Sequence, residues 1–262
     1  MDINLYYADK NEKPLDRIVD DGGFCKIFRT IGVIGDSLSS GEFESFEEGI
    51  KGYHDFYEYS WGQFMARALG SKVYNFSRGG MTTKAFIESF GSQCGAFEYE
   101  KLCQAYIIAL GINDHNKDGA LGDPYKSKEL TTWDDDSFMT CYGNIIKAIK
   151  RKQPKAKFFL VTMPDDTAYS AEKIKKRIEW NEAIRALAEV FDNTYIIDLE
   201  KYAPTFDEKF RKTFFLGHMT PTGYILIAKM VMSYIDWIIR NNPSDFNQVG
   251  FIGTPYSYNE EK

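Results

Sequence analysis

Apolar positions along the chain alternate between short continuous runs and longer segments with helical periodicity. Five of the runs end at turn residues, as strands buried on both faces of a sheet do. They cover residues 27–35, 73–76, 105–110, 157–162 and 195–199. The pattern therefore predicts five buried strands that are separated by helical segments.

Three helices are predicted by apolar residues spaced three and four positions apart. The first begins near Phe138 and ends before Pro154, because proline cannot continue a helix. A second helix covers 174–188 and carries Lys and Glu on its outer face. The last begins with Thr220 as its N-cap and Pro221 at its first position, which is a common helix start.

Strands that alternate with helices predict one parallel sheet covered on both faces. We therefore expect a flavodoxin-like three-layer α/β/α sandwich with five parallel strands. No repeat or linker divides the sequence, so we expect a single domain over 1–262, with a core of about 27–240 and a tail at 241–262. The polar tail with scattered aromatic residues covers either its own domain or a partner subunit, and the sequence leaves both open.

Ligands of such sheets bind beyond the carboxyl ends of the strands, so the residues that follow each strand are the first candidates for chemistry. Ser37 follows the first strand in a glycine-bounded turn. Gly80 follows the second strand and Asn113 the third. His218 precedes the last helix. The sequence thus predicts a hydroxyl, a backbone N–H, a carboxamide and an imidazole at one edge of the sheet.

These four pieces, in this order, resemble the SGNH (GDSL-type) hydrolase family, which is named after a Ser, a Gly, an Asn and a His. The resemblance spans about residues 27–240 and selects Gly80, which lies five residues after Asn75. It implies a serine esterase in which Ser37 is the nucleophile and His218 is the base that activates it. The N–H groups of Ser37 and Gly80 and the amide of Asn113 would form the oxyanion hole. This mechanism requires neither a cofactor nor a metal.

The sequence departs from the family pattern at Phe215, where the family carries an Asp three residues before the histidine. A phenyl ring cannot accept the imidazole N–H. One hypothesis is a Ser–His dyad in which a backbone carbonyl near Phe215 orients His218. A second is a carboxylate from elsewhere, with Asp165, Asp166 or Asp207 as candidates. A third is a poorly oriented histidine with slight or no activity.

Two long connections are expected to form walls of the site. Residues 42–61 contain seven aromatic residues and six acids, opposed by Lys51 alone. The aromatic side chains could stack on a sugar ring, line a pocket for an apolar acyl chain, or pack against their own domain. The connection 115–136 ends in three aspartates that we expect to begin the helix at Phe138. Asp36 and Asp114 are expected to hold the strand-end turns in shape and not to act as acid or base.

Composition excludes several classes of protein. The 262 residues include 32 basic and 38 acidic side chains, and no basic stripe predicts a nucleic-acid partner. We identify no apolar run of membrane-spanning length and no secretory signal, so no membrane partner is expected. The four cysteines lack CxxC spacing and are expected to be reduced packing residues. Together these features predict a cytoplasmic protein.

The expected substrate is a small-molecule ester, with acetyl or another short acyl group on a carbohydrate or other small alcohol. The alternative from another class is a non-catalytic sugar- or ligand-binding protein on a hydrolase scaffold, which Phe215 favours. A flavin or nucleotide protein is disfavoured, because no GxGxxG or GxxxxGK loop follows the first strand.

Overall fold

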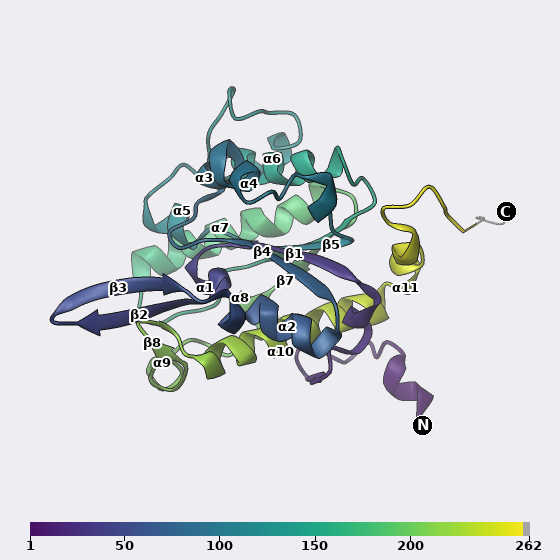
Figure 1. The fold of residues 1–262 in the computed structure, drawn as a ribbon, viewed down its shortest axis with the longest axis horizontal. Helices are drawn as coiled ribbons and strands as arrows, with labels where there is room; N and C mark the ends of the chain where they lie inside the picture. Colours follow the sequence, from purple (N-terminus) through teal and green to yellow (C-terminus); the bar gives the residue numbers. More distant parts are fainter. Residues whose placement is uncertain (259–262) are drawn as a thin grey trace.

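Five parallel strands form the central sheet of the computed structural model, which describes residues 1–258 (Figure 1). Their order in the sheet is β4-β1-β5-β6-β7, which is the flavodoxin-like order when only these five strands are numbered. The predicted fold class is therefore confirmed. The strands are β1 (Thr30–Gly35), β4 (Lys72–Ser77), β5 (Ala105–Ala109), β6 (Lys157–Val161) and β7 (Thr194–Ile197).

Each predicted strand is present, but the start of the first and the end of the last were wrong by two residues or more. Residue Ile27 belongs to a short 3-10 helix, η2 (Gly23–Ile27), before β1 begins. Leu199 opens the short helix α8 (Leu199–Tyr202) after β7 has ended. Both residues are apolar and packed in or against the core, so the apolar run extends beyond the hydrogen-bonded strand.

Helices cover both faces of the sheet and create a separate apolar core on each side (Figure 1). Helices α2 (Trp61–Leu69) and α10 (Pro221–Asn241) contribute to one core, and α6 (Phe138–Lys150) and α7 (Ala171–Val190) contribute to the other. Along β1, Ile31 and Val33 face the first core, and Ile34 faces the second. This alternation fixes the register, because a shift by one residue would exchange the two faces.

Helix α10 begins as the sequence predicts. The Thr220 hydroxyl accepts a hydrogen bond from the Gly223 N–H at 3.3 Å, and Pro221 occupies the first turn. The helix is long and apolar enough to cross a membrane by length and composition, with a mean hydropathy of 1.3. However, 72% of that apolar window is buried inside the fold. It is the core helix of one layer.

The N-terminus and the last described residues of the tail lie at the same end of the molecule in Figure 1. After α10, the chain forms α11 (Pro243–Phe246) and η7 (Val249–Phe251). Phe246 is buried and packs against Phe28 and Phe159 of the core. This part of the tail therefore covers its own domain, which was one of the two expected alternatives. Residues 259–262 of the predicted tail lie outside the described part of the chain.

The connection 42–61 was expected to be a loop, and this was wrong. It forms an antiparallel hairpin of β2 (Glu42–Glu47) and β3 (Ile50–Asp55), followed by η3 (Tyr57–Tyr59). The turn consists of Glu48 and Gly49, both with positive φ, as a two-residue turn of type I′ requires. In Figure 1 the hairpin extends from the body on the side opposite to the N-terminus.

The remaining elements are short and connect those above. They are η1 (Ile3–Tyr6), α1 (Ser37–Ser40), α3 (Thr83–Ala85), the π-helical turn η4 (Phe86–Phe90), α4 (Gly91–Gln93), η5 (Tyr99–Lys101), α5 (Ile112–Asn116), η6 (Pro124–Lys126), α9 (Glu208–Phe214), β8 (Phe215–Leu216) and β9 (His218–Met219).

Candidate active site

The turn after β1 places Ser37 at the start of the short helix α1. Asp36 is the N-cap of that helix, and its carboxylate accepts a hydrogen bond from the Leu38 N–H at 3.0 Å. A side chain at Gly35 would lie 2.2 Å from the Ser39 hydroxyl, so only glycine allows the strand and the helix to approach this closely. The sequence thus forms a sharp strand-to-helix turn that carries Ser37 at the carboxyl edge of the sheet.

A pocket of about 300 Å³ lies at this edge and brings together Ser37, Asn113 and His218. These residues come from α1, α5 and β9, which are far apart in the sequence. Gly80 is not among the residues that line the pocket, but its loop is tied to them. The Asn113 side-chain amide donates a hydrogen bond to the carbonyl of Met81 at 3.1 Å. Of the four predicted positions, three therefore line the pocket. The fourth, Gly80, is adjacent in the sequence to Met81, which contacts Asn113.

Asp36 and Asp114 stabilise the turns, as expected. Asp114 accepts hydrogen bonds from the backbone N–H of Thr83 at 3.0 Å and from its hydroxyl at 2.8 Å. Burial raises the pKa of Asp114, although the bonds from Thr83 oppose the shift. Burial also raises the pKa of Asp36 to about 7, and the nearby Asp114 and Glu42 act in the same direction. Both carboxyl groups are therefore buried and accept hydrogen bonds from backbone N–H groups of the loops.

All three histidines lie in the described part of the chain, and among them His218 alone lines the pocket with Ser37. The ring of His115 is buried and lies 3.1 Å from the Lys173 carbonyl oxygen through Nε2. His54 lies on the hairpin, where its Nε2 contacts the Ser45 hydroxyl at 2.8 Å. The two other histidines therefore have contacts away from the pocket, and His218 is the histidine that shares a pocket with Ser37.

Two carboxylates of the hairpin flank the imidazole of His218. Glu44 lies 2.9 Å from Nδ1, and Glu42 lies 3.0 Å from Nε2. Because side chains alternate along a strand, Glu42 and Glu44 share one face of β2. Phe43 points to the other face and packs on Tyr224. The hairpin thus brings two acids to a histidine that lies more than 170 residues away in the sequence.

The expectation that the backbone near Phe215 orients His218 was wrong, because Glu44 occupies Nδ1. A carboxylate from elsewhere does contact Nδ1, but it belongs to Glu44 and to none of the three acids named in the second hypothesis. Asp165 pairs with Arg177 at 2.6 Å, and Asp166 pairs with Arg211 at 2.7 Å. Asp207 is the N-cap of α9 and accepts a hydrogen bond from the Phe210 N–H. Each of the three is already engaged in a local structural contact.

The two glutamates differ in their surroundings. Burial by itself would raise the pKa of Glu44, but hydrogen bonds from Lys51 and His218 outweigh it and lower the pKa. The Lys51 ammonium lies 2.6 Å from the Glu44 carboxylate. Burial raises the pKa of Glu42, with His218 opposing and Asp55 contributing to the rise. Glu44 is therefore held in the ionised form, whereas Glu42 retains a proton more readily.

The walls of the pocket differ from the expected aromatic and loop walls. Of the aromatic residues in 42–61, Trp61 lines the pocket, whereas Phe46 and Tyr53 are exposed on the hairpin. From 115–136, Asn116 contributes to the lining. The apolar part of the lining comes instead from the strand ends and the two cores, namely from Val161, Met163, Leu199, Phe206, Ile227 and Val231.

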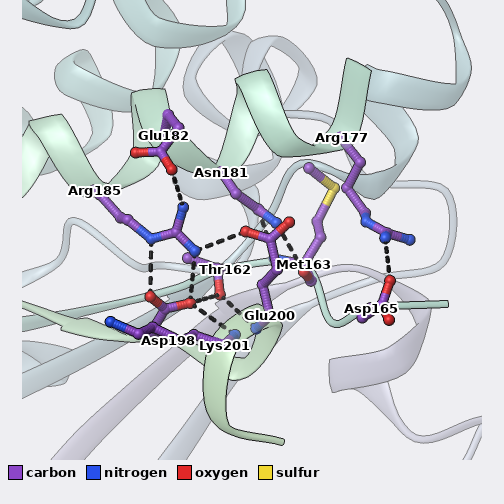
Figure 2. Close-up of polar contacts among 10 residues, drawn as sticks. All are labelled: Thr162, Met163, Asp165, Arg177, Asn181, Glu182, Arg185, Asp198, Glu200 and Lys201. Carbon is purple, nitrogen blue, oxygen red and sulfur yellow. Dashed lines mark hydrogen bonds and ion pairs between the residues drawn. The ribbon is translucent and has the colours of Figure 1, made fainter. Parts of the chain in front are cut away.

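Helix α7 fixes the strand ends on one side of the pocket (Figure 2). The buried Asn181 amide accepts from the Met163 N–H at 2.8 Å and donates to the Met163 carbonyl at 2.9 Å. Arg185 binds Asp198 through two nitrogens, each at 2.8 Å from a carboxylate oxygen. Figure 2 shows these side chains pointing from the helix towards the segments after β6 and β7. The pocket wall at Met163 is therefore hydrogen-bonded to helix α7.

Two further sequence predictions concern cysteine and the aspartates before α6. All four cysteines are free thiols, as predicted. Asp135 accepts hydrogen bonds from the hydroxyls of Ser137 and Thr140 at the start of the helix, which agrees with the expected role of this acidic segment. Among residues 1–258, no group of three or more His, Cys, Asp or Glu side chains is arranged to hold a metal.

The acids that contact His218 were missed because nothing in their spacing relates them to the histidine. The available signal was the segment 42–47, EFESFE, whose first residues alternate acid and aromatic side chains as a half-exposed strand does. A glycine at position 49 marks the turn. Together these features indicate a hairpin, and the period of two places Glu42 and Glu44 on one face.

Comparison with known proteins agrees with this geometry. The profile of the GDSL-like Lipase/Acylhydrolase family matches residues 33–226, which is most of the chain. The protein is thus a GDSL-type ester hydrolase by fold and sequence pattern. It belongs to the GDSL-like lipase/acylhydrolase family. No curated protein sequence matches the chain.

Several solved structures share the fold at low sequence identity. A family two carbohydrate esterase from Clostridium thermocellum, in complex with cellohexaose, is 16% identical with a TM-score of 0.58, over 83% of this chain and 65% of that one. The acetyl xylan esterase AlAXEase is 17% identical with a TM-score of 0.54, over 79% of this chain and 99% of that one. A family 3 carbohydrate esterase from Clostridium thermocellum is 18% identical with a TM-score of 0.52, over 81% and 97%.

Proposed function

We propose that this ester hydrolase acts through an acyl-serine intermediate on Ser37 and removes short acyl groups, such as acetyl, from carbohydrates or other small alcohols. The observation that carries the proposal is the pocket itself. Ser37, Asn113 and His218 line one cavity although they come from three distant parts of the chain. A nucleophile, a base and an amide donor are the groups that acyl transfer requires.

In the proposed reaction, the Ser37 hydroxyl attacks the ester carbonyl carbon while His218 accepts its proton. The carbonyl oxygen becomes an oxyanion, held by the N–H groups of Ser37 and Gly80 and by the Asn113 amide. The alcohol then leaves with the proton from His218. Water, deprotonated by the same histidine, releases the acid and restores Ser37.

The size and charge of the pocket support a small neutral substrate. Its volume of about 300 Å³ is at the lower end of the range for small-molecule sites, about 300–1,000 Å³. In its lining, Asp36 and Asp166 are balanced by Arg177 and Arg211. Two further acids, Glu42 and Glu44, lie beside His218. Since the chain also has a net charge of −6, anionic substrates are disfavoured. The carbohydrate esterases that share the fold are consistent with an acetylated sugar.

The test is a panel of p-nitrophenyl esters of increasing acyl length, together with acetylated monosaccharides and xylo-oligosaccharides, assayed with wild type and Ser37→Ala. We expect turnover of the acetyl esters that the variant lacks. A fluorophosphonate probe should label Ser37 in the wild type. Wild-type protein that neither turns over any ester nor reacts with the probe would contradict the proposal and favour a ligand-binding protein.

A further inference from the structure

We propose that Glu44, presented by the β2–β3 hairpin, is the positioning residue that orients His218 for its reaction with Ser37. The inference rests on the proposed function of Ser37 and His218. The family carries an Asp at the position of Phe215, and a phenyl ring cannot accept a hydrogen bond from the imidazole N–H. The proposal assigns this role to Glu44 instead. The direct observation is the contact of 2.9 Å between the Glu44 carboxylate and Nδ1 of His218.

The choice of nitrogen follows from the neighbours of the ring. The Tyr224 hydroxyl donates to the Glu42 carbonyl at 2.8 Å and contacts the Ser37 carbonyl at 3.5 Å, so the backbone of Glu42 lies beside that of Ser37. Nε2 contacts the carboxylate of Glu42, the residue whose backbone lies beside Ser37. Nδ1 faces Glu44 on the opposite side. A serine that reacts through Nε2 requires the proton on Nδ1, and an acid at Nδ1 holds that tautomer.

The loop that carries His218 leaves space for a carboxylate from another segment of the chain. Gly217 has a φ of 75°, and a side chain at this position would lie 2.0 Å from the Glu44 carboxylate. The absent side chain of Gly217 thus leaves the space that Glu44 fills. Glu42 rests in the same way against Gly79, where a side chain would lie 2.0 Å from its carboxylate. Both of these glutamate carboxylates therefore occupy space that a side chain in place of glycine would fill.

The hairpin also fixes the carboxylate itself. Lys51 and Tyr53 lie on the same face of the hairpin as Glu44, because Tyr53 pairs with Glu44 across the strands. Lys51 binds the second carboxylate oxygen at 2.6 Å, and the ring of Tyr53 meets the His218 ring edge-on at 6.0 Å. The Glu44 side chain is only 15% exposed. An ionised, partly buried carboxylate with both oxygens engaged is what an orienting acid requires.

Glu44→Gln and Glu44→Ala test the assignment, with Glu47→Gln as the matched control. Glu47 lies on the same strand but is exposed and points to the opposite face. We expect kcat for p-nitrophenyl acetate to fall by about a hundredfold or more in both Glu44 variants, with little change in KM. The control should stay within about twofold of wild type. Glu44→Asp should recover part of the lost kcat, because it keeps the charge at a greater distance.

The pH profile separates positioning of the histidine from a merely structural role. Glu44→Gln removes a negative charge that stabilises the imidazolium, so the acid limb of the kcat/KM profile should move to lower pH. Thermal unfolding of the same proteins reports whether the hairpin change affects the fold. A variant of native stability with a reduced kcat and a shifted acid limb supports the proposal.

Two results would overturn it. The first is kcat within about threefold of wild type in Glu44→Ala. The second is a loss of kcat that appears in Glu42→Gln but not in Glu44→Gln, which would make Glu42 the orienting acid. Ser37→Ala, measured in parallel, distinguishes a failure of the proposed function from a failure of the role assigned to Glu44. If Ser37→Ala remains active, the proposed function fails, whereas an inactive Ser37→Ala with a fully active Glu44→Ala removes only the role of Glu44.

Discussion

The amide of Asn113 should account for a large part of the stabilisation of the transition state. Its nitrogen carries two hydrogens, and one of them donates to the Met81 carbonyl at 3.1 Å. The other remains for an oxyanion in the pocket that Asn113 lines with Ser37. Loss of one such donor typically raises the barrier by about 2.7–4 kcal/mol, which corresponds to a hundredfold to thousandfold fall in kcat.

Asn113→Ala is therefore expected to lower kcat for p-nitrophenyl acetate by a factor of about 10²–10³. The fold should lose little stability, because the broken bond to Met81 is partly exposed and is worth about 0.5–1.5 kcal/mol. Fluorophosphonate labelling of Ser37 would show that the nucleophile is still in place, and Asn247→Ala, at an exposed position in the tail, is the control. A kcat within threefold of wild type would remove Asn113 from the mechanism.

Three further predictions concern stability and the His218 loop. Burial raises the pKa of Asp36 from 3.8 to about 7, so the folded state keeps a proton that the unfolded state loses over this interval. The free energy of unfolding should therefore fall by up to ~1.4 kcal/mol per pH unit as the pH rises through this interval. Urea titrations of Asp36→Asn at several pH values should not show this part of the fall. Asn181→Ala leaves the buried N–H and C=O of Met163 without partners and should reduce the free energy of unfolding by about 2–4 kcal/mol; a loss below 1 kcal/mol in the same titration would contradict this. Gly217→Ala should displace Glu44 and lower kcat by more than about tenfold, since the new methyl group would meet its carboxylate at 2.0 Å at a strained φ of 75°; wild-type kcat in this variant would show that the loop adapts.

The sheet could be predicted because burial on both faces leaves a direct mark on the sequence. All residues of β6 are buried, and β1 has five buried residues out of six. Such strands read as continuous apolar runs. The same reasoning overextended the first and last strands, because apolar residues beside a strand also pack into the core without joining the ladder. Composition reports burial, and only hydrogen bonding defines where a strand ends.

The hairpin could not be found in this way, because its strands are largely exposed. Phe46 and Ile50, next to the turn, are each 74% exposed. The turn is Glu48–Gly49, whereas Asn-Gly and Asp-Gly are the strong signals for a two-residue hairpin. The four predicted positions of the site could be found from the sequence because each follows a predicted strand or precedes a predicted helix. Glu44 has no such landmark, and its partner His218 is 174 residues away.

The source of the acid matters for how the site is held together. The histidine requires only a carboxylate oxygen at hydrogen-bond distance from Nδ1, and any segment that reaches this point can supply it. The position of an acid within the loop of His218 would be as stable as the loop itself. Glu44 instead belongs to a two-stranded sheet to which no third strand of residues 1–258 is hydrogen-bonded, and such hairpins are only marginally stable alone. Its place therefore depends on the contacts of the hairpin with the body, notably Phe43 on Tyr224 and Asp55 with the Ser40 hydroxyl. Since local opening requires less free energy than global unfolding, orientation of His218 is more easily lost than the fold that carries Ser37.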